Sequence, residues 1–205
     1  RTGTSPGDLS IPALVNFKTR DAEAMSQAGD YEAVSGTLVF ESDSNSVSQT
    51  STITVKIFGD TFVEKDETFL IELSDVLGNA RLLEKTATVT ITGDDQSLVR
   101  IDNVSVHENE GTATIFVSLD KPVDATVSVD YTTANRTAYS TADYVSSSGT
   151  ITFTAGTQSQ FITIPIVNNG QVEAEESFYV NLSHIQSEGA NVAFSDSQGE
   201  VSIQD

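Results

Sequence analysis

Residues 57–69 read IFGDTFVEKDETF, which leads from one apolar segment through an acidic turn into another. The same pattern recurs at residues 166–178, which read IVNNGQVEAEESF. Two apolar segments joined by a turn rich in carboxylates, and used twice, predict a repeated β domain with oxygen donors gathered at one end.

Alternation of apolar and polar residues with a period of two extends outward from both stretches, and helical periodicity is scarce. In the first half it runs through Ile53, Val55 and Ile57 and through Phe69, Ile71 and Leu73. Gly, Asp, Asn and Ser separate these segments, as turns do in antiparallel sheets. The sequence therefore predicts an all-β protein of two tandem antiparallel β-sandwiches. Pro165 cannot donate to a ladder, so we expect it on an edge strand or at a bulge.

The two halves align over several ordered signals. A Gly/Ala-Asp-Tyr motif and a Ser-Gly-Thr motif that ends in Phe occur in both. Asp30 and Asp143 are 113 positions apart, and Glu64 and Glu173 are 109 apart. We place one domain at residues 1–95 and the second at residues 96–205. The second copy opens with segments near 99–106 and 112–119 that have no counterpart in the first, so we expect the first domain to lack its N-terminal strand or strands.

Composition limits the partners. The chain of 205 residues has 30 Asp and Glu against 10 Lys and Arg, a formal net charge of −20. Binding of phosphate backbones requires a basic face, so we expect no nucleic acid partner. The charge also opposes binding to anionic lipid, and without an apolar run of 18 residues we expect no direct membrane insertion. Cysteine is absent, which excludes disulfides and thiolate metal sites.

No arrangement of residues indicates catalysis. His107 and His184 are the two histidines, and neither lies near a recognisable nucleophile motif. Carboxylate pairs of the kind that cleave glycosides are compatible with the composition, but these acids fall in repeated turns, which suit a metal better than a single cleft. We therefore expect a protein that is not an enzyme.

Three motifs resemble the Calx-β family: Asp-Tyr before Ser-Gly-Thr-x-x-Phe, the acidic turn that ends in Glu-x-x-Glu-[Ser/Thr]-Phe, and the closing Val-Thr-Ile-Thr-Gly-Asp-Asp of residues 89–95. The family includes regulatory calcium-binding domains of sodium–calcium exchangers and repeats of large adhesion proteins. The resemblance covers nearly the whole chain. It implies an immunoglobulin-like sandwich whose loops hold Ca²⁺ at one end.

The resemblance also implies a set of Ca²⁺ ligands. In the first domain they are Asp30, Asp60, Glu64, Asp94 and Asp95, and in the second Glu108, Asp143, Asn169, Glu173 and Asp205.

Ca²⁺ takes six to eight hard oxygen ligands, and its affinity rises with the number of charged ones. Asn168 and Asn169 replace acids of the turn, so we expect the second domain to bind more weakly or not at all. In the alternative interpretation, Asp30 and Asp143 only cap loops. We interpret Glu175 and Glu176 as surface acids at the entry to a strand.

These observations favour a calcium-binding structural or interaction module of a larger extracellular adhesion or aggregation protein. In this hypothesis Ca²⁺ rigidifies the joint between the domains, and the partners are calcium ions and other protein or glycan surfaces at the cell surface. The alternative is a cytosolic Ca²⁺-sensing regulatory tandem of a sodium–calcium exchanger, the cytoplasmic part of a membrane protein. An acidic spacer without a metal is the third possibility.

Overall fold

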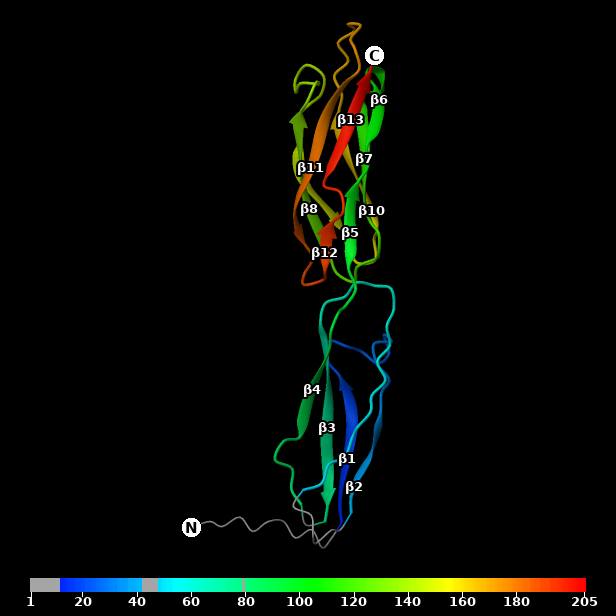
Figure 1. The fold of residues 1–205 in the computed structure, drawn as a ribbon, viewed down its shortest axis with the longest axis vertical. Helices are drawn as coiled ribbons and strands as arrows, with labels where there is room; N and C mark the ends of the chain where they lie inside the picture. Colours follow the sequence, from blue (N-terminus) through cyan, green and yellow to red (C-terminus); the bar gives the residue numbers. More distant parts are fainter. Residues whose placement is uncertain (1–11, 42–47, 79) are drawn as a thin grey trace, which may run out of the picture. The chain divides into compact units, whose positions relative to one another are not determined.

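A computed structural model describes residues 12–41, 48–78 and 80–205, and in these ranges the protein is built of β-strands and one turn of 3-10 helix (Figure 1). Contacts divide the chain into two compact units. Unit 1 comprises the described residues up to Asp60 together with Asp66–Thr92, and unit 2 comprises Thr61–Lys65 and Gly93–Asp205. The all-β prediction is confirmed. The expected incomplete start of the first domain falls on residues 1–11, outside the described residues.

Unit 1 contains one four-stranded antiparallel sheet in the order β2-β1-β3-β4. Its strands are β1 (Ala13–Asp21), β2 (Ser35–Phe40), β3 (Glu67–Leu77) and β4 (Thr86–Ile91). Phe69 and Ile71 on β3 pair with Val89 and Ala87 on β4. The acidic turn of residues 57–69 thus leads into the central strand β3.

The strand predicted at Ile53–Ile57 is wrong for the described residues. The segment forms an isolated bridge between Tyr31 and Ile57, which consists of two backbone hydrogen bonds, from the Glu32 N–H to Lys56 and from the Phe58 N–H to Asp30. Its counterpart in unit 2 is hydrogen-bonded along its length to a neighbouring strand. No strand takes that neighbour's place among the described residues of unit 1, so the alternating side chains have no ladder to join.

Unit 2 is a sandwich of two sheets, ordered β10-β7-β5-β12 and β6-β13-β11-β8-β9. Its elements are β5 (Ser97–Ile101), β6 (Val104–His107), the 3-10 turn η1 (Glu108–Glu110), β7 (Thr112–Leu119), β8 (Val127–Asn135), β9 (Ser148–Phe153), β10 (Ser159–Pro165), β11 (Glu176–Gln186), β12 (Val192–Phe194) and β13 (Gln198–Gln204). Pro165 ends the edge strand β10, as expected.

Two details of unit 2 depart from a purely antiparallel sandwich. The segment expected as one strand near 99–106 splits between Ile101 and Val104, so that β5 joins one sheet and β6 the other. Each half pairs in parallel, β5 with β12 and β6 with β13. A segment that changes sheets in this way ties the two layers together.

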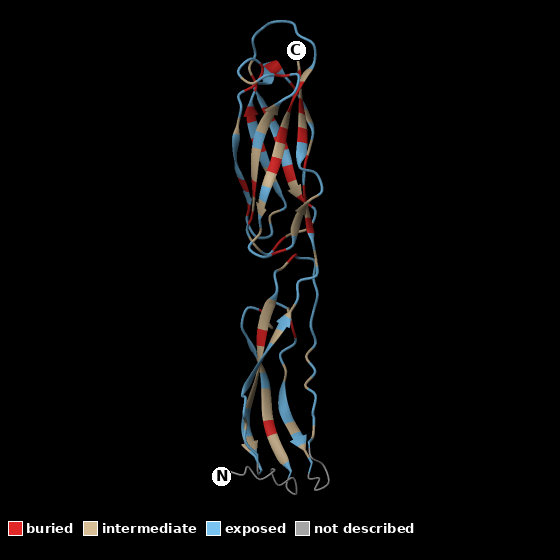
Figure 2. Ribbon diagram, turned by 60° about the vertical axis from the view of Figure 1, so that its left-hand side comes forward, coloured by how far each residue is buried: buried red, intermediate tan, exposed pale blue. Residues whose placement is uncertain are grey.

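The two units differ in the size of their cores. Figure 2 shows buried residues along most strands of unit 2 and at few positions in unit 1. The buried cluster of unit 2 draws on both sheets, whereas that of unit 1 consists of Ala24, Tyr31 and Phe69, with partly buried apolar residues packed against it. Since burial of apolar surface is the main favourable term in folding, unit 1 has less to stabilise it among its described residues.

An aromatic stack occurs in both units at equivalent positions. The rings of Tyr31 and Phe69 lie 4.2 Å apart at 13°, and those of Tyr144 and Phe178 lie 3.9 Å apart at 9°. All four side chains are buried. Each stack joins the loop that carries the Asp-Tyr motif to the central strand of a sheet, β3 or β11.

Each tyrosine hydroxyl also donates a hydrogen bond to the end of the adjoining strand. Tyr31 donates to Asp21 over 2.5 Å, and Tyr144 donates to Asn135 over 2.6 Å. The bond from Tyr31, followed by that from the Ser26 backbone, lowers the pKa of Asp21 below its ordinary value. The two units thus form the same hydrogen bond, but its acceptor is an ionisable carboxyl group in unit 1 and a neutral amide in unit 2.

Packing between neighbouring strands explains the glycine of the Ser-Gly-Thr motif in both units. Gly36 pairs with Phe17, and Gly149 pairs with Tyr131. A Cβ atom at Gly36 would lie 3.0 Å from the Phe17 ring, and one at Gly149 would lie 3.1 Å from the Tyr131 ring. In both units an aromatic ring covers the glycine and fills the space that a side chain would take.

Phe69→Ala should destabilise unit 1 by about 3–5 kcal/mol because it leaves a cavity in a small core. We expect the substitution to unfold unit 1 at room temperature, which limited proteolysis with mass spectrometry would detect as cleavage within residues 12–60. The equivalent change Phe178→Ala is the control, since the larger core of unit 2 should leave that unit folded. Equal susceptibility of the two units would contradict the difference in their cores.

Acidic pH should reduce the stability of unit 1, because it protonates the carboxyl group of Asp21. Because its folded pKa is depressed, the stabilisation is present above the ordinary pKa of 3.8 and is lost as pH falls through the folded value. Asp21→Asn, which copies Asn135, keeps the acceptor for Tyr31 and cannot titrate. Urea melts at pH 7 and pH 3 should show a smaller loss of stability in this variant than in the wild-type protein, and an identical loss would contradict the role of Asp21.

Candidate metal centre

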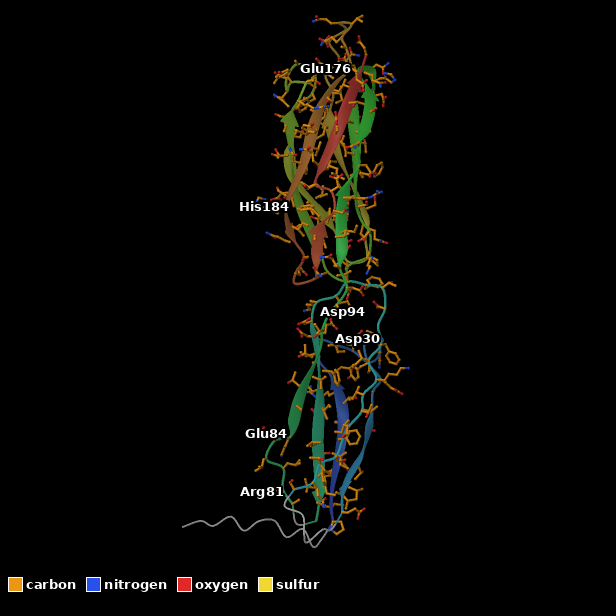
Figure 3. All side chains as sticks on the ribbon, in the orientation of Figure 1. Asp30, Arg81, Glu84, Asp94, Glu176 and His184 are labelled. Carbon is orange, nitrogen blue, oxygen red and sulfur yellow. The ribbon has the colours of Figure 1, made fainter. Side chains whose placement is uncertain are left out.

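Acidic side chains gather at the end of unit 2 that carries the C-terminus, where Figure 3 labels Glu176. They line a small open pocket, whose walls are Glu108, Glu173, Ala174, Glu176, Ile203 and Asp205. These residues come from η1, the loop between β10 and β11, the start of β11 and the end of β13. Four carboxyl groups therefore face one pocket from separate parts of the chain.

Glu108 is the buried member of this group. It follows β6 in η1, a turn closed by Gly111 in the left-handed conformation and by a bond from the His107 N–H to the Glu110 carboxylate. Burial raises the pKa of Glu108, and the negative charges of Asp205 and Glu173 raise it further. The backbone N–H of Asn169 donates a hydrogen bond to it and acts in the opposite direction. A carboxylate at this position would be stabilised by any nearby cation.

Asp143 and Glu176 form a second close contact. Asp143 is buried and caps its own loop by accepting the Tyr139 N–H over 2.7 Å, as the capping interpretation predicted. Its carboxyl group also lies close to that of Glu176. Burial raises the pKa of Glu176, and the charge of Asp143 adds to the effect.

The structure corrects the interpretation of Glu176 as a surface acid. Its side chain lines the acidic pocket, whereas its neighbour Glu175 is exposed. The available signal was position: Glu176 begins β11 and directly precedes Ser177 and Phe178, which the structure shows to be buried.

The loop between β10 and β11 closes over the pocket through hydrogen bonds. The Asn169 side-chain amide donates to Glu173 over 3.1 Å, and its oxygen accepts the Gln171 N–H over 2.7 Å. The Glu173 N–H in turn donates to Asp205 over 2.7 Å. In the second domain an asparagine amide therefore makes one of the contacts with Glu173 that a cation would make.

The acids expected as ligands of the first domain divide between the two units. Asp30 and Asp60 belong to unit 1, and Glu64, Asp94 and Asp95 belong to unit 2. Asp30 caps its loop by accepting the Met25 N–H over 2.6 Å, as Asp143 does in unit 2. Their grouping into one calcium site stays a prediction.

Asp95 has a cationic partner that the sequence pattern does not single out. The Lys121 ammonium lies 2.5 Å from the Asp95 carboxylate. This hydrogen bond raises the pKa of Lys121, and the charges of Asp120 and Asp94 add to the shift. Lysine therefore already neutralises part of the charge at the predicted ligands Asp94 and Asp95.

The segment Thr61–Lys65 lies against unit 2 and contributes to its core. Val63 is fully buried there, and the burial of a valine side chain stabilises by about 1.5–3 kcal/mol. Gly93 passes so close that an added Cβ atom would lie 2.4 Å from the Glu64 carbonyl oxygen. Glycine at this position thus allows the close approach of two backbone segments.

The chemistry of the acidic pocket fits a hard divalent cation, because every side-chain donor is an oxygen. In the part of the chain that the structure describes, however, no three Asp, Glu or His side chains converge closely enough to form a finished ligand set. Glu108, Asp143, Glu173, Glu176 and Asp205 are the carboxyl groups that would have to close on an ion.

Comparison with known proteins supports the resemblance noted from the motifs. The family model described as Calx-beta domain matches residues 3–96 and again residues 94–205. The chain belongs to the Calx-beta family. Two tandem copies account for its repeat.

Sodium/calcium exchangers are among the proteins that this chain resembles in sequence. Sodium/calcium exchanger 3 of Rattus norvegicus is 27% identical over 201 residues, which is 86% of this chain and 21% of that protein. Sodium/calcium exchanger 1 of Mus musculus is 26% identical over 198 residues, 86% of this chain and 20% of that protein. The chain thus spans about a fifth of the length of these relatives.

Among solved structures, the crystal structure of CBD12 from CALX1.2 matches with a TM-score of 0.51 and 21% identity, over 97% of this chain and 90% of that one. The likeness shows the fold of a Calx-beta tandem. Separately, no helix among the described residues is both long and apolar enough to cross a membrane.

Glu176→Gln tests the crowding of carboxyl groups in the second Calx-beta domain. At neutral pH in chelator it should raise the thermal midpoint of unit 2, because it removes a charge from a pocket where burial and Asp143 oppose ionisation. In calcium the same variant should gain less stability than the wild-type protein.

Glu175→Gln is the matched control, because it removes the same charge from an exposed neighbour. Calorimetric scans of both variants give the comparison. If the two variants shift the midpoint equally in chelator, the pocket does not repel charge as inferred.

Proposed function

We propose that the chain is a calcium-binding regulatory tandem of Calx-beta domains, as in the alternative interpretation of the sequence. The observation that carries the proposal is the buried Glu108 carboxyl group in a pocket that Glu173, Glu176 and Asp205 also line. Burial raises the pKa of Glu108, and the negative charges of its neighbours raise it further. A divalent cation at this place would relieve repulsion that the protein otherwise bears. When bound, the ion supplies positive charge that holds the loops of the domain together.

Sodium/calcium exchangers as relatives favour the regulatory interpretation over an extracellular adhesion module, and no relative noted above is an adhesion protein. In this proposal the tandem lies in the cytoplasmic part of a membrane protein, does no catalysis, and changes conformation when calcium binds. The shift requires a difference in calcium affinity between two conformations.

The residues of this chain have separate parts in the proposal. In unit 2, Glu108 and Asp143 are buried donors fixed by the 3-10 turn and by a capped loop, and Glu173, Glu176 and Asp205 close the pocket. Asp30, Asp60, Glu64, Asp94 and Asp95 remain the proposed ligands of the first domain. The amide of Asn169 and the ammonium of Lys121 reduce the negative charge available to an ion, so occupancy should differ between the sites.

Calcium titration by calorimetry tests the proposal. The wild-type protein should release or absorb heat with a dissociation constant of about 10⁻⁷–10⁻⁵ M, the range of intracellular sensors. A constant of about 10⁻⁴–10⁻³ M would instead suit an extracellular module. Asp60→Ala should weaken or abolish binding at the first-domain site, and Asp66→Ala, at a neighbouring exposed acid, is the control.

Small-angle scattering with and without calcium gives the second readout, because a regulatory tandem must change shape or flexibility. Absence of heat at millimolar calcium, together with an unchanged thermal midpoint, would contradict calcium binding and leave an acidic spacer.

A further inference from the structure

One stretch of unit 2 carries no charge although the chain is strongly acidic. Charged residues make up 20% of the sequence, and its formal net charge is −20. The 29 residues from position 144 to position 172 nevertheless contain no Asp, Glu, Lys or Arg. They include β9 and β10, which are edge strands of the two sheets and contact each other. An uncharged segment therefore forms both strand edges on one side of the sandwich.

The edge strand β10 leaves backbone hydrogen-bonding groups unused (Figure 1). It pairs with β7 on one side, and among the described residues no strand pairs with its other side. The Leu119 N–H donates to the Gln158 carbonyl, so the even-numbered residues of this strand bond to β7. In an antiparallel ladder the backbone groups of Ser159, Phe161 and Thr163 then point outward. We call residues 159–163 the open edge.

Pro165 marks the end of the open edge. Its carbonyl accepts the Val145 N–H over 2.9 Å, and proline has no N–H to offer. Natural proteins protect edge strands with charged side chains, above all Lys, or with Pro. In β10 such protection is confined to the last residue, and residues 159–163 have none.

Two phenylalanines lie beside the open edge on the outer face of the sheet. Phe161 pairs with Phe116 of β7, and the two side chains are 59% and 52% exposed. They occupy a pair of positions without mutual backbone hydrogen bonds, where opposite side chains approach most closely. Contiguous apolar surface of this kind is typical of interaction sites.

The first repeat shows that the fold does not need an aromatic side chain at this place. Ile57 and Ile166 are equivalent and 109 positions apart, which puts Thr52 at the position of Phe161 and Lys56 at that of Pro165. Phe161 is therefore a feature of the second repeat and not a requirement of the sandwich.

We propose that the open edge binds the open edge of a second copy of this chain, antiparallel and across a two-fold axis beside Phe161. In this register Phe161 faces the partner's Phe161, and Ser159 faces the partner's Thr163. Each outward N–H then meets a carbonyl of the other strand, as in other complexes that extend a sheet. With Phe116 from each copy, the contact places four rings in a row across the joined sheets.

Charge favours a second copy as the occupant. Two chains of net charge −20 repel each other, so they can associate only through surfaces without like charges. The open edge has no charged side chain, and Arg100 and Asp102 beyond β7 pair with each other over 3.6 Å. A basic partner would gain more from the acidic surfaces elsewhere. An antiparallel edge is also its own complement about a two-fold axis.

Sedimentation equilibrium of the 205-residue chain in chelator tests the proposal, and the wild-type protein should form a reversible dimer. Phe161→Lys and Phe161→Glu should each raise the dissociation constant of the dimer at least about tenfold, because like charges then face each other at the centre of the contact. An equimolar mixture of the two variants should associate again, since opposite charges now face each other. This rescue requires that residue 161 faces its own copy.

Tyr139→Lys is the matched control. Tyr139 is an aromatic residue of the same unit with nearly the same exposure, 60%, in the loop between β8 and β9, and the substitution changes the charge equally. This variant should associate as the wild-type protein does.

Three results would overturn the proposal. The first is a wild-type chain that stays monomeric up to about 1 mM, the range of very weak association, which would leave the open edge to a strand of another protein. The second is equal association of Phe161→Lys and Tyr139→Lys, and the third is a mixture of the charge variants that stays monomeric. Because chelator is present throughout, none of these results depends on calcium binding.

Discussion

The stack of a tyrosine on a phenylalanine fixes the position of the acids in both units. Tyr31 and Tyr144 each follow the aspartate of the Asp-Tyr motif, so the ring that packs on Phe69 or Phe178 also holds Asp30 or Asp143 at the end of a sheet. The hydroxyl bond to Asp21 or Asn135 sets the orientation of the ring. The capped loop that carries each aspartate follows from this one arrangement.

Electrostatics then decides what the end of unit 2 can do. Desolvation makes the charged forms of Glu108 and Glu176 costly, and their acidic neighbours raise the cost further. The protein reduces the repulsion between its carboxylates with hydrogen-bond donors of its own. The Asn169 amide donates to Glu173 and, elsewhere in unit 2, the Lys121 ammonium donates to Asp95. The balance between such internal donors and an external ion sets the affinity of each site.

Much of the fold could be predicted from the sequence because period-two alternation and a repeated motif are local signals. Pro165 at the end of an edge strand and the strand through Phe69 and Ile71 follow from these signals. The segment Ile53–Ile57 shows the limit of such predictions. Its alternation is that of a strand, but a local pattern does not reveal whether a neighbouring strand is present to pair with it. Glu176 and Lys121 were missed for a related reason, because their surroundings come from segments distant in the chain.

The glycine of the Ser-Gly-Thr motif limits how the sequences of the two halves can diverge. Since the rings of Phe17 and Tyr131 occupy the space over Gly36 and Gly149, neither the glycine nor the ring can be exchanged independently at low cost. A larger residue at the glycine would require a smaller one across the strand. In an alignment of Calx-beta repeats these two columns should therefore covary, retained together or replaced together, even where the surrounding β-strand residues drift freely.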